Sequence, residues 1–404
     1  MEPWKKNLYV MLAVQFTMFV LFTSVFSYMP LFIMELGISG QDRVAFWSGL
    51  ISSISSLFAA LSSPIWGRWS DRTGYKNNLL RSCVAVVLFN FLSGLSTNVY
   101  QLMVFRILQG CFSGFAAASV SMVGAGTPAL SLGFALGWLQ TAQVLGAMVG
   151  PMVGGALADL FSYRQVFFIA SGLGLVATAL ALALLDEPGL KKSERPAPLT
   201  HALAGLPAVS RRAILAMLVV LFCAQFGTRC VEPILSLHVI NLGQSPSSVG
   251  TLTGILFTAA ALGQLLAITL FVKQISSWGH KRVLQTTLLG AGLLYFPHIL
   301  VGKVWPLVAL RLGVGAFLGA VIPTANALVG SLVPPSRRGA VYGLTTSALF
   351  LGSFLSVLGS GVLAALLGIP AVFLAAGGLL FLAAAWVWIT VPGGEDKGDG
   401  EHVN

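Results

Sequence analysis

Residues 67–76 read Gly-Arg-Trp-Ser-Asp-Arg-Thr-Gly-Tyr-Lys and form a short polar segment between two apolar runs, 44–65 and 78–96. Each run is close to the roughly 20 apolar residues that a helix needs to cross the hydrocarbon core of a bilayer. Gly67 and Gly74 allow a tight turn, because glycine accepts backbone conformations that other residues avoid. The segment therefore predicts a loop between two membrane-spanning helices.

The composition of the whole chain agrees with this prediction. Of the 404 residues, 56% are hydrophobic and only 9% are charged, whereas about 25% are charged in an average soluble chain. This excludes a soluble enzyme or a secreted module, and it indicates a polytopic membrane protein. Four cysteines lie inside apolar runs, so we expect packing residues rather than a disulfide set or a metal site.

No nucleotide-binding motif accompanies the apolar runs. Gly302-Lys303 is followed by Val304, and Pro297 stands where a phosphate-binding loop has its first glycine. We therefore expect no cofactor, and any pumping must draw on another energy source, such as a proton gradient.

Apolar runs of spanning length occur twelve times. They cover residues 8–36, 44–65, 78–96, 99–122, 131–158, 165–185, 212–241, 246–272, 283–301, 304–332, 339–365 and 370–391. An even number of spans places both termini on one side of the membrane.

The distribution of Lys and Arg predicts which side that is. With the amino terminus inside, 17 of the 23 basic residues fall in or beside cytoplasmic segments, and only Arg43, Arg164 and Lys303 fall outside. Basic residues collect in cytoplasmic loops of helical membrane proteins. We expect cytoplasmic termini, and we assign the net charge of +10 to topology rather than to nucleic-acid binding.

Two related halves can be recognised in the twelve runs. A shift of 205 positions places Gly74, Arg106 and Gly110 on Gly279, Arg311 and Gly315, and a shift of 206 places Gly146 on Gly352. Parallel repeats of this kind imply a binding site between two halves that rock against each other. The predicted division is an amino-terminal six-helix bundle at 1–185, a cytoplasmic linker at 186–211, a carboxyl-terminal six-helix bundle at 212–391 and a cytoplasmic tail at 392–404.

Three local motifs resemble those of the major facilitator superfamily, and in particular of its bacterial twelve-helix drug:proton antiporters. Segment 67–76 is similar to the family loop motif Gly-x-x-x-Asp-Arg-x-Gly-Arg-Lys/Arg, with Tyr75 in place of the usual arginine. The resemblance implies an all-α major facilitator fold of two pseudo-symmetric six-helix bundles. It also implies a latch that holds the cytoplasmic side shut, formed by Gly67, Asp71, Arg72, Gly74 and Lys76.

The second motif is Arg106-Ile107-Leu108-Gln109-Gly110, which is similar to the family Arg-x-x-x-Gly motif associated with proton transfer. An arginine inside a span costs at least about 2.5–3.5 kcal/mol, so Arg106 should face a cavity or a partner. It could equally be a structural arginine bonded to nearby carbonyls. We expect Gly110 and Gly114 to share a face that allows close helix approach.

The third motif lies in run 131–158 and resembles the antiporter motif, which is typical of exporters. Its residues are Gly146, Gly150, Pro151, Gly154 and Gly155. The glycines permit close helix contact and the proline bends the helix. The resemblance implies export as the direction of transport.

Among the 13 acidic residues, Glu232 alone lies well inside a predicted span, and Glu35 at the outer end of the first span is the runner-up. Gln225, Arg229, Glu232 and Ser236 follow helical spacing and share one face. We predict that Glu232, Arg106 and Arg229 take part in proton coupling. The alternative is a static Arg229–Glu232 pair that neutralises itself.

The resemblance also implies that spans one, four, seven and ten line a central cavity. Three arginines against one glutamate make that region net positive, which suits an anion, a zwitterion or a neutral lipophile better than a cation. The residues predicted to line the cavity are Gln15, Ser24, Tyr28, Gln109, Gln140, Gln143, Gln225, Arg229, Arg311 and Asn326.

The leading hypothesis is thus a proton-coupled multidrug exporter of the bacterial inner membrane, a transporter rather than an enzyme. We expect a multi-pass monomer whose partners are the lipid bilayer, protons and a small-molecule substrate. A dedicated exporter of an anionic or zwitterionic metabolite, such as a metal-chelating metallophore or a sugar derivative, is an alternative that the arginines favour. An uncoupled facilitator or lipid flippase is a further alternative.

Overall fold

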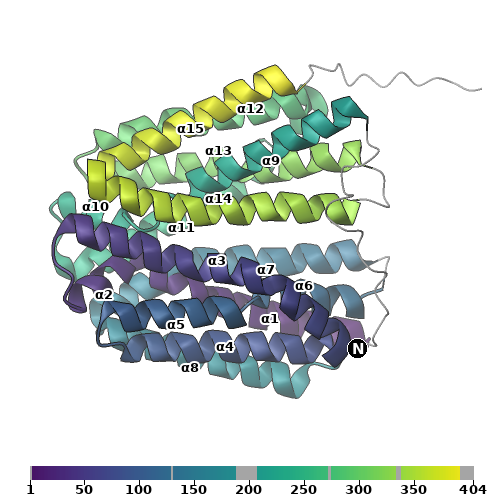
Figure 1. The fold of residues 1–404 in the computed structure, drawn as a ribbon, viewed down its shortest axis with the longest axis horizontal. Helices are drawn as coiled ribbons and strands as arrows, with labels where there is room; N and C mark the ends of the chain where they lie inside the picture. The colour runs from purple at the N-terminus through teal and green to yellow at the C-terminus, as the bar shows by residue number, and fades with distance from the viewer. Residues whose placement is uncertain (1, 129–130, 188–206, 272–273, 334–337, 392–404) are drawn as a thin grey trace, which may run out of the picture.

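The computed structural model describes residues 2–128, 131–187, 207–271, 274–333 and 338–391, and these ranges are almost entirely α-helical. The helices run roughly parallel to one another in two groups, with the amino-terminal helices in the lower half of Figure 1 and the carboxyl-terminal ones above them. The predicted all-α membrane fold is confirmed. Most of the predicted linker, at 188–206, and the tail at 392–404 lie outside the described ranges.

Within the described ranges, the first half holds eight α-helices. They are α1 (Pro3–Ser24), α2 (Met29–Glu35), α3 (Gln41–Thr73), α4 (Tyr75–Leu95), α5 (Val99–Phe112), α6 (Phe115–Gly126), α7 (Leu132–Leu160) and α8 (Tyr163–Leu184), with the 3-10 helix η1 (Val25–Ser27) between α1 and α2.

In the part of the second half that the structure describes there are seven α-helices. They are α9 (Ala208–Arg229), α10 (Leu235–Asn241), α11 (Val249–Leu270), α12 (Ile275–Tyr295), α13 (Val304–Leu332), α14 (Arg338–Leu367) and α15 (Ile369–Thr390), with the 3-10 helices η4 (Pro246–Ser248) and η6 (Phe296–Ile299).

Eleven helical segments in the described ranges are long and apolar enough to cross a membrane, against the twelve that the sequence predicts. The missing one is the ninth, predicted at 283–301. Its helix α12 begins at Ile275 and ends at Tyr295, before Pro297. Its first turns are polar and contain Ser276, Ser277, His280, Lys281 and Arg282. The polar first turns leave an apolar stretch in α12 shorter than a full span.

Two predicted spans are divided at equivalent places. The first becomes α1 and α2, with Pro30 in the first turn of α2, and the seventh becomes α9 and α10, with Pro233 in the intervening turn. Proline has no N–H to donate and its ring clashes with the preceding turn, so neither helix continues straight through. We call the side of the bundle with α2 and α10 the distal side, and the side where α1 begins and α15 ends the terminal side (Figure 1).

Helix four of the first half is also divided, but its equivalent in the second half is not. Gly114 has a φ of 101° and separates α5 from α6, while its repeat counterpart Gly319 lies inside the continuous helix α13. Arg81 donates to the carbonyls of Phe112 and Ser113, and Trp66 donates to that of Cys111, so the break has bonded carbonyls. The prediction that Gly114 supports close helix approach is wrong, since nothing lies within 4 Å of a Cβ built there.

Gly110 does mark a close approach. A Cβ on Gly110 would lie 2.3 Å from the carbonyl oxygen of Ser55 in α3, and a Cβ on its counterpart Gly315 would lie 2.0 Å from that of Ala260 in α11. Ser55 and Ala260 are themselves 205 positions apart, so the two halves repeat the same helix contact. This is the contact that the arginine-bearing helices make with their neighbours.

The antiporter motif packs α7 against two helices. Cβ atoms on Gly146, Gly150 and Gly154 would lie 2.6 Å, 2.1 Å and 2.2 Å from atoms of α1, and one on Gly155 would lie 2.0 Å from the carbonyl oxygen of Gly250 in α11. Glycine at these places lets backbones touch, and such contacts hold helices together in an apolar solvent. The motif therefore joins α7 to its own half through α1 and to the other half through α11.

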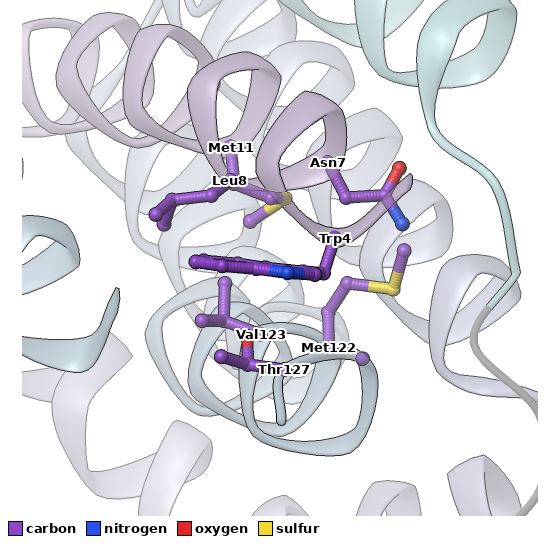
Figure 2. A pocket seen from close by; sticks show the side chains of 8 residues that line it. Trp4, Asn7, Leu8, Met11, Met122, Val123 and Thr127 are labelled. Carbon is purple, nitrogen blue, oxygen red and sulfur yellow. The ribbon is translucent and has the colours of Figure 1, made fainter. Parts of the chain in front are cut away.

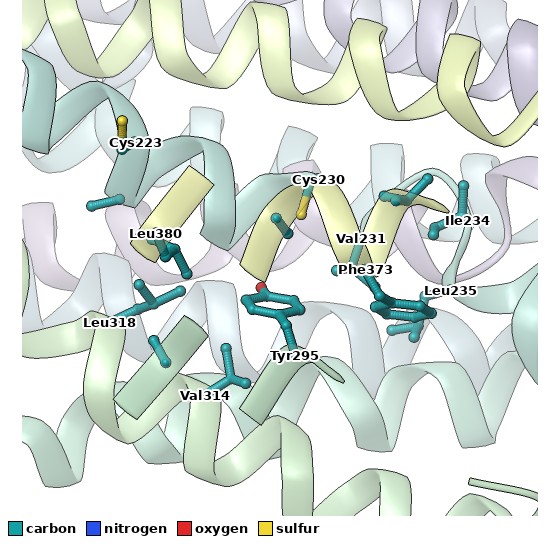
Figure 3. Packing of buried hydrophobic residues seen from close by; sticks show 14 of the residues in the cluster. Cys223, Cys230, Val231, Ile234, Leu235, Tyr295, Val314, Leu318, Phe373 and Leu380 are labelled. Carbon is teal, nitrogen blue, oxygen red and sulfur yellow. The ribbon is translucent and has the colours of Figure 1, made fainter. Parts of the chain in front are cut away.

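The buried hydrophobic residues of the second half belong to a core cluster that extends into the first half at Val25, Phe32 and Phe167, and part of this cluster is shown in Figure 3. Tyr295 and Phe373 are fully buried, and Cys230, Val231 and Leu235 pack around them from the turn that follows α9 and from the start of α10. The hydroxyl of Tyr295 donates to the carbonyl of Gly227 near the end of α9. This contact anchors the divided seventh span to α12.

We predict that Gly154→Ala destabilises the protein by about 1–3 kcal/mol, because the added methyl group overlaps the backbone of Ser24. Thermal unfolding of the purified protein in detergent measures this effect. The matched control is Gly172→Ala in α8, where nothing lies within 4 Å of the added carbon. Equal stability of the two variants would contradict the tight α1–α7 contact.

Candidate substrate and proton site

The divided seventh span places an ion pair at its turn. Nη1 of Arg229, the last residue of α9, lies 2.6 Å from Oε1 of Glu232, and the two side chains are 33% and 11% exposed. The guanidinium carbon of Arg229 lies 5.8 Å from the ring centroid of Phe26, which belongs to the turn of the first span. The pair therefore lies where the two halves meet.

Arg106 lies apart from this pair, inside the first half. It is 6% exposed, and its Nη1 donates to Oε1 of Gln109 at 2.8 Å. Its guanidinium carbon lies 5.8 Å from the ring centroid of Phe167 in α8. Its Nε and Nη2 find no acceptor among the described residues, and neither does the hydroxyl of Tyr28 find a partner there. Arg106 is thus a buried cation with two nitrogen donors, Nε and Nη2, that have no acceptor in the described ranges.

Arg311 has an equivalent place inside the second half. It is 3% exposed, and its Nε has no partner within the described ranges. In those ranges no carboxylate lies within salt-bridge distance of Arg106 or Arg311. The structure brings only part of the predicted set together: Arg229 is paired with Glu232, Arg311 lies close enough to interact electrostatically with Glu232, and Arg106 lies apart in the first half.

Two amide side chains from the predicted cavity set link equivalent helix pairs. Nε2 of Gln15 lies 3.4 Å from Oε1 of Gln143, joining α1 to α7, and Nε2 of Gln225 donates to Oγ of Ser353 at 2.8 Å, joining α9 to α14. Gln15 is fully buried, whereas Gln143 and Gln225 are partly exposed. Oε1 of Gln15 has no partner in the described ranges, so this amide still offers an acceptor besides its contact with Gln143.

The remaining members of the set are more dispersed. Ser24 is buried and donates to the carbonyl of Leu21 in its own helix, Gln140 is exposed on α7, and Asn326 is half-buried in α13. Gln109 is buried and occupied by Arg106.

A hollow of about 360 Å³ opens on α7 beside Phe134, Gly137, Trp138 and Thr141. Gly137 precedes Gly155 by 18 residues, which is five helical turns, so both lie on the same face of α7. A Cβ on Gly155 would overlap α11, while nothing lies within 4 Å of one on Gly137. The close contact between α7 and α11 on the distal side therefore does not extend along α7 to Gly137 on the terminal side.

A second, enclosed pocket near the start of the chain is too small for a ligand. It measures about 10 Å³, and Figure 2 shows the indole of Trp4 lying between Leu8 and Met11 of α1 and Met122 and Val123 of α6. This contact anchors α6, the segment that follows the break at Gly114.

Of the predicted latch, only Gly74 and Lys76 can be described in full, because the surroundings of Gly67, Asp71 and Arg72 lie outside the described structure. Gly74 has a φ of 104° and precedes α4, whose first N–H groups, on Tyr75 and Lys76, donate to the carboxylate of Glu187 at 2.7 Å and 2.9 Å. Nζ of Lys76 donates to the carbonyls of Leu182 and Leu185. The acceptor at the start of α4 is thus Glu187, a residue outside the predicted latch set.

Two histidines of the second half, the fully buried His298 and the partly exposed His238, were not singled out from the sequence. His298 is fully buried, its Nδ1 lies 2.8 Å from the carbonyl oxygen of Leu294, and its ring lies 5.1 Å from that of Phe373. The ring of His238 in α10 lies 5.2 Å from the same phenylalanine. The sequence signal that could have identified these two residues is a histidine inside an apolar run. No cluster of His, Cys, Asp and Glu that could hold a metal occurs in the described ranges.

Comparison with known proteins gives consistent matches over nearly the whole chain. The family model described as Major Facilitator Superfamily matches residues 11–229 and 217–403. The multidrug resistance protein MdtG of Proteus mirabilis is 30% identical over 389 residues, covering 96% of each chain, and that of Citrobacter koseri is 31% identical over 385 residues, covering 95% of each. A bacterial homologue of the human lysosomal transporter Spinster, solved in an inward-facing and unoccupied conformation, superposes with a TM-score of 0.77 at 18% identity, over 96% of this chain and 97% of that one.

We predict that Glu232→Gln lowers stability by about 1–2 kcal/mol, because it leaves Arg229 without its anion, with the loss limited by the exposed third of the arginine side chain. The double variant Arg229→Gln/Glu232→Gln should recover most of this loss, since no unpaired charge remains. Denaturation of the three purified proteins measures both effects. Additive losses in the double variant would show that the two residues do not interact.

Proposed function

The chain belongs to the major facilitator superfamily, and we propose that it is a proton-coupled multidrug exporter of the bacterial inner membrane that works by alternating access. The names of the relatives support multidrug efflux. The observation that carries the coupling proposal is the Arg229–Glu232 pair at the boundary of the two halves.

Glu232 is the carboxylate that we assign to proton binding. As an anion it attracts Arg229, and as a neutral acid it releases the guanidinium toward the other half. Only a contact that differs between two conformations can shift their equilibrium, and the contact of Arg229 with Phe26 crosses the boundary that alternating access must remodel. Arg106 lies too deep in its own bundle to pair with Glu232 in this conformation, so its part in coupling would come in another state.

The orientation that we propose places the terminal side in the cytoplasm. The split of the basic residues, 17 against 3, supports it. The hollow beside Gly137 on α7 then faces the cytoplasm, from which an exporter loads its substrate. The monomer is the proposed unit, because each chain brings both halves of the site.

We predict that Glu232→Gln abolishes pH-gradient-driven export while protein levels stay normal. Purified protein in proteoliposomes, with ethidium as substrate and an imposed pH gradient, gives the measurement, and the expected rate is that of protein-free liposomes. Glu35→Gln is the control, because Glu35 pairs with Arg164 at 3.2 Å on the distal side within one half. Full coupled transport by Glu232→Gln would overturn the assignment, and transport with no substrate-linked proton movement would favour a facilitator or flippase.

A dedicated exporter of an anionic or zwitterionic metabolite is the second candidate. The buried guanidinium groups of Arg106 and Arg311, with free donors and no carboxylate partner in the described ranges, favour it. Metallophores with several carboxylates and acidic sugar derivatives are substrates of this chemistry.

We predict that, under this second function, a polycarboxylate such as citrate raises the thermal stability of the purified protein. A ligand at 100 times its Kd adds about 2.7 kcal/mol. Ethidium and sodium chloride of equal ionic strength serve as the comparisons. Stabilisation by the dye alone would count against the metabolite exporter and for the multidrug exporter.

A further inference from the structure

Asp159 makes a contact between the two halves that neither the motifs nor the proposed coupling pair accounts for. It is the penultimate residue of α7 and lies on the distal side. Its Oδ1 accepts from the backbone N–H of Gly250 at 3.0 Å, and its Oδ2 accepts from that of Thr251 at 2.6 Å. Both donors belong to the first turn of α11, so one carboxylate of the first half binds the start of a helix of the second.

The chemistry of this contact favours a charged acceptor. The first N–H groups of a helix have no partner within the helix, and the helix dipole gives that end a partial positive charge that attracts an anion. A carboxylate that accepts two such bonds forms a charge-assisted contact, which is stronger than one between neutral groups. Asp159 is half-buried, so water screens the contact only in part.

Two glycines at the contact between α7 and α11 let the Asp159 carboxylate approach the backbone of α11. A Cβ on Gly250 would lie 2.6 Å from Oδ1 of Asp159, and one on Gly155 would lie 2.0 Å from the carbonyl oxygen of Gly250. Asp159 follows Gly155 by four residues, so both are on one face of α7. The last glycine of the antiporter motif and Asp159 thus contact the same two residues of α11.

The contact lies at the distal end of the boundary between α7 and α11, which we call the seam. The seam is closely packed at this end but not near Gly137, toward the terminal side. Along the seam, Oγ1 of Thr258 donates to the carbonyl of Met148 at 2.9 Å, and nearer the terminal side nothing lies within 4 Å of a Cβ on Gly137. When the distal ends of α7 and α11 separate, both bonds of Asp159 must break. The bonds therefore stabilise the conformation that is closed on the distal side relative to the one that is open there.

We propose that Asp159 is a positioning residue for transport: it caps α11 from across the boundary and thereby sets the balance between the conformations closed and open on the distal side. This rests on the proposed alternating-access transport but not on its coupling to protons or on its substrate. Neutralising Asp159 removes the charge from the contact and shifts the balance toward the open conformation.

Distances between spin labels at Ser39→Cys and Ser247→Cys test the proposal, because these exposed residues lie in distal loops of different halves. Pulsed electron paramagnetic resonance on the purified protein without substrate gives the two populations, with label uptake by the unsubstituted protein as background. We expect Asp159→Asn to raise the ratio of open to closed populations roughly tenfold. The matched control is Asp42→Asn, an exposed acid in the first turn of α3 on the same side, which should leave the ratio unchanged.

Unchanged populations in Asp159→Asn would overturn the proposal, and so would an equal shift in Asp42→Asn. Thermal unfolding of the same samples separates a general loss of stability from a shift of conformation. If Asp159→Asn does not yield folded protein, Asp159→Glu keeps the charge one methylene farther out and should give a smaller shift in the same direction. Failure of the unsubstituted protein to export ethidium would refute the proposed function, but it would not affect the interpretation of the measured distances.

Discussion

Between helices immersed in hydrocarbon the hydrophobic effect gives little attraction, so association depends on close packing and on polar contacts. In this protein α7 takes part in two such contacts, because its glycines bring its backbone against α1 on one face and α11 on another. The same helix thus belongs firmly to one half and touches the other. A side chain at Gly146, Gly150 or Gly154 would loosen the first contact, and one at Gly155 would loosen the second, so the motif combines rigidity within a half with a separable seam between halves.

The charged groups obey a second constraint, which is that an ion inside the membrane must be buried in protein or paired. Arg106 and Arg311 satisfy it by burial in the two bundles, and Arg229 satisfies it by pairing with Glu232 at the boundary. Repeat symmetry explains the first two, which are 205 positions apart. The pair has no such counterpart, so the group assigned to proton binding lies where the symmetry between the halves is broken.

Much of this arrangement could be predicted from local sequence. Run length gave the spans, and glycine spacing gave the contacts of Gly110 and Gly155, because both signals lie within one helix. The partners of Asp159 are 91 and 92 residues away in the chain, and Glu187 reaches α4 across more than 110 residues. No periodicity encodes such contacts. The separation of Arg106 from the Arg229–Glu232 pair could not be predicted either, since depth along a helix does not reveal which way a side chain points.

The fate of two equivalent glycines shows why sequence repeats are an incomplete guide. Gly114 ends α5 while Gly319 lies within α13, and glycine alone permits either outcome. A break inside the membrane leaves carbonyl groups that need donors. Arg81 and Trp66 supply them at Gly114, with the guanidinium carbon 3.6 Å from the indole centroid, whereas the positions 205 residues later are Thr286 and Phe271. The second half has no such donors at these positions, so its helix stays continuous. The two repeats therefore differ on the terminal side, where the fourth helix of the first half is divided and its counterpart α13 is continuous.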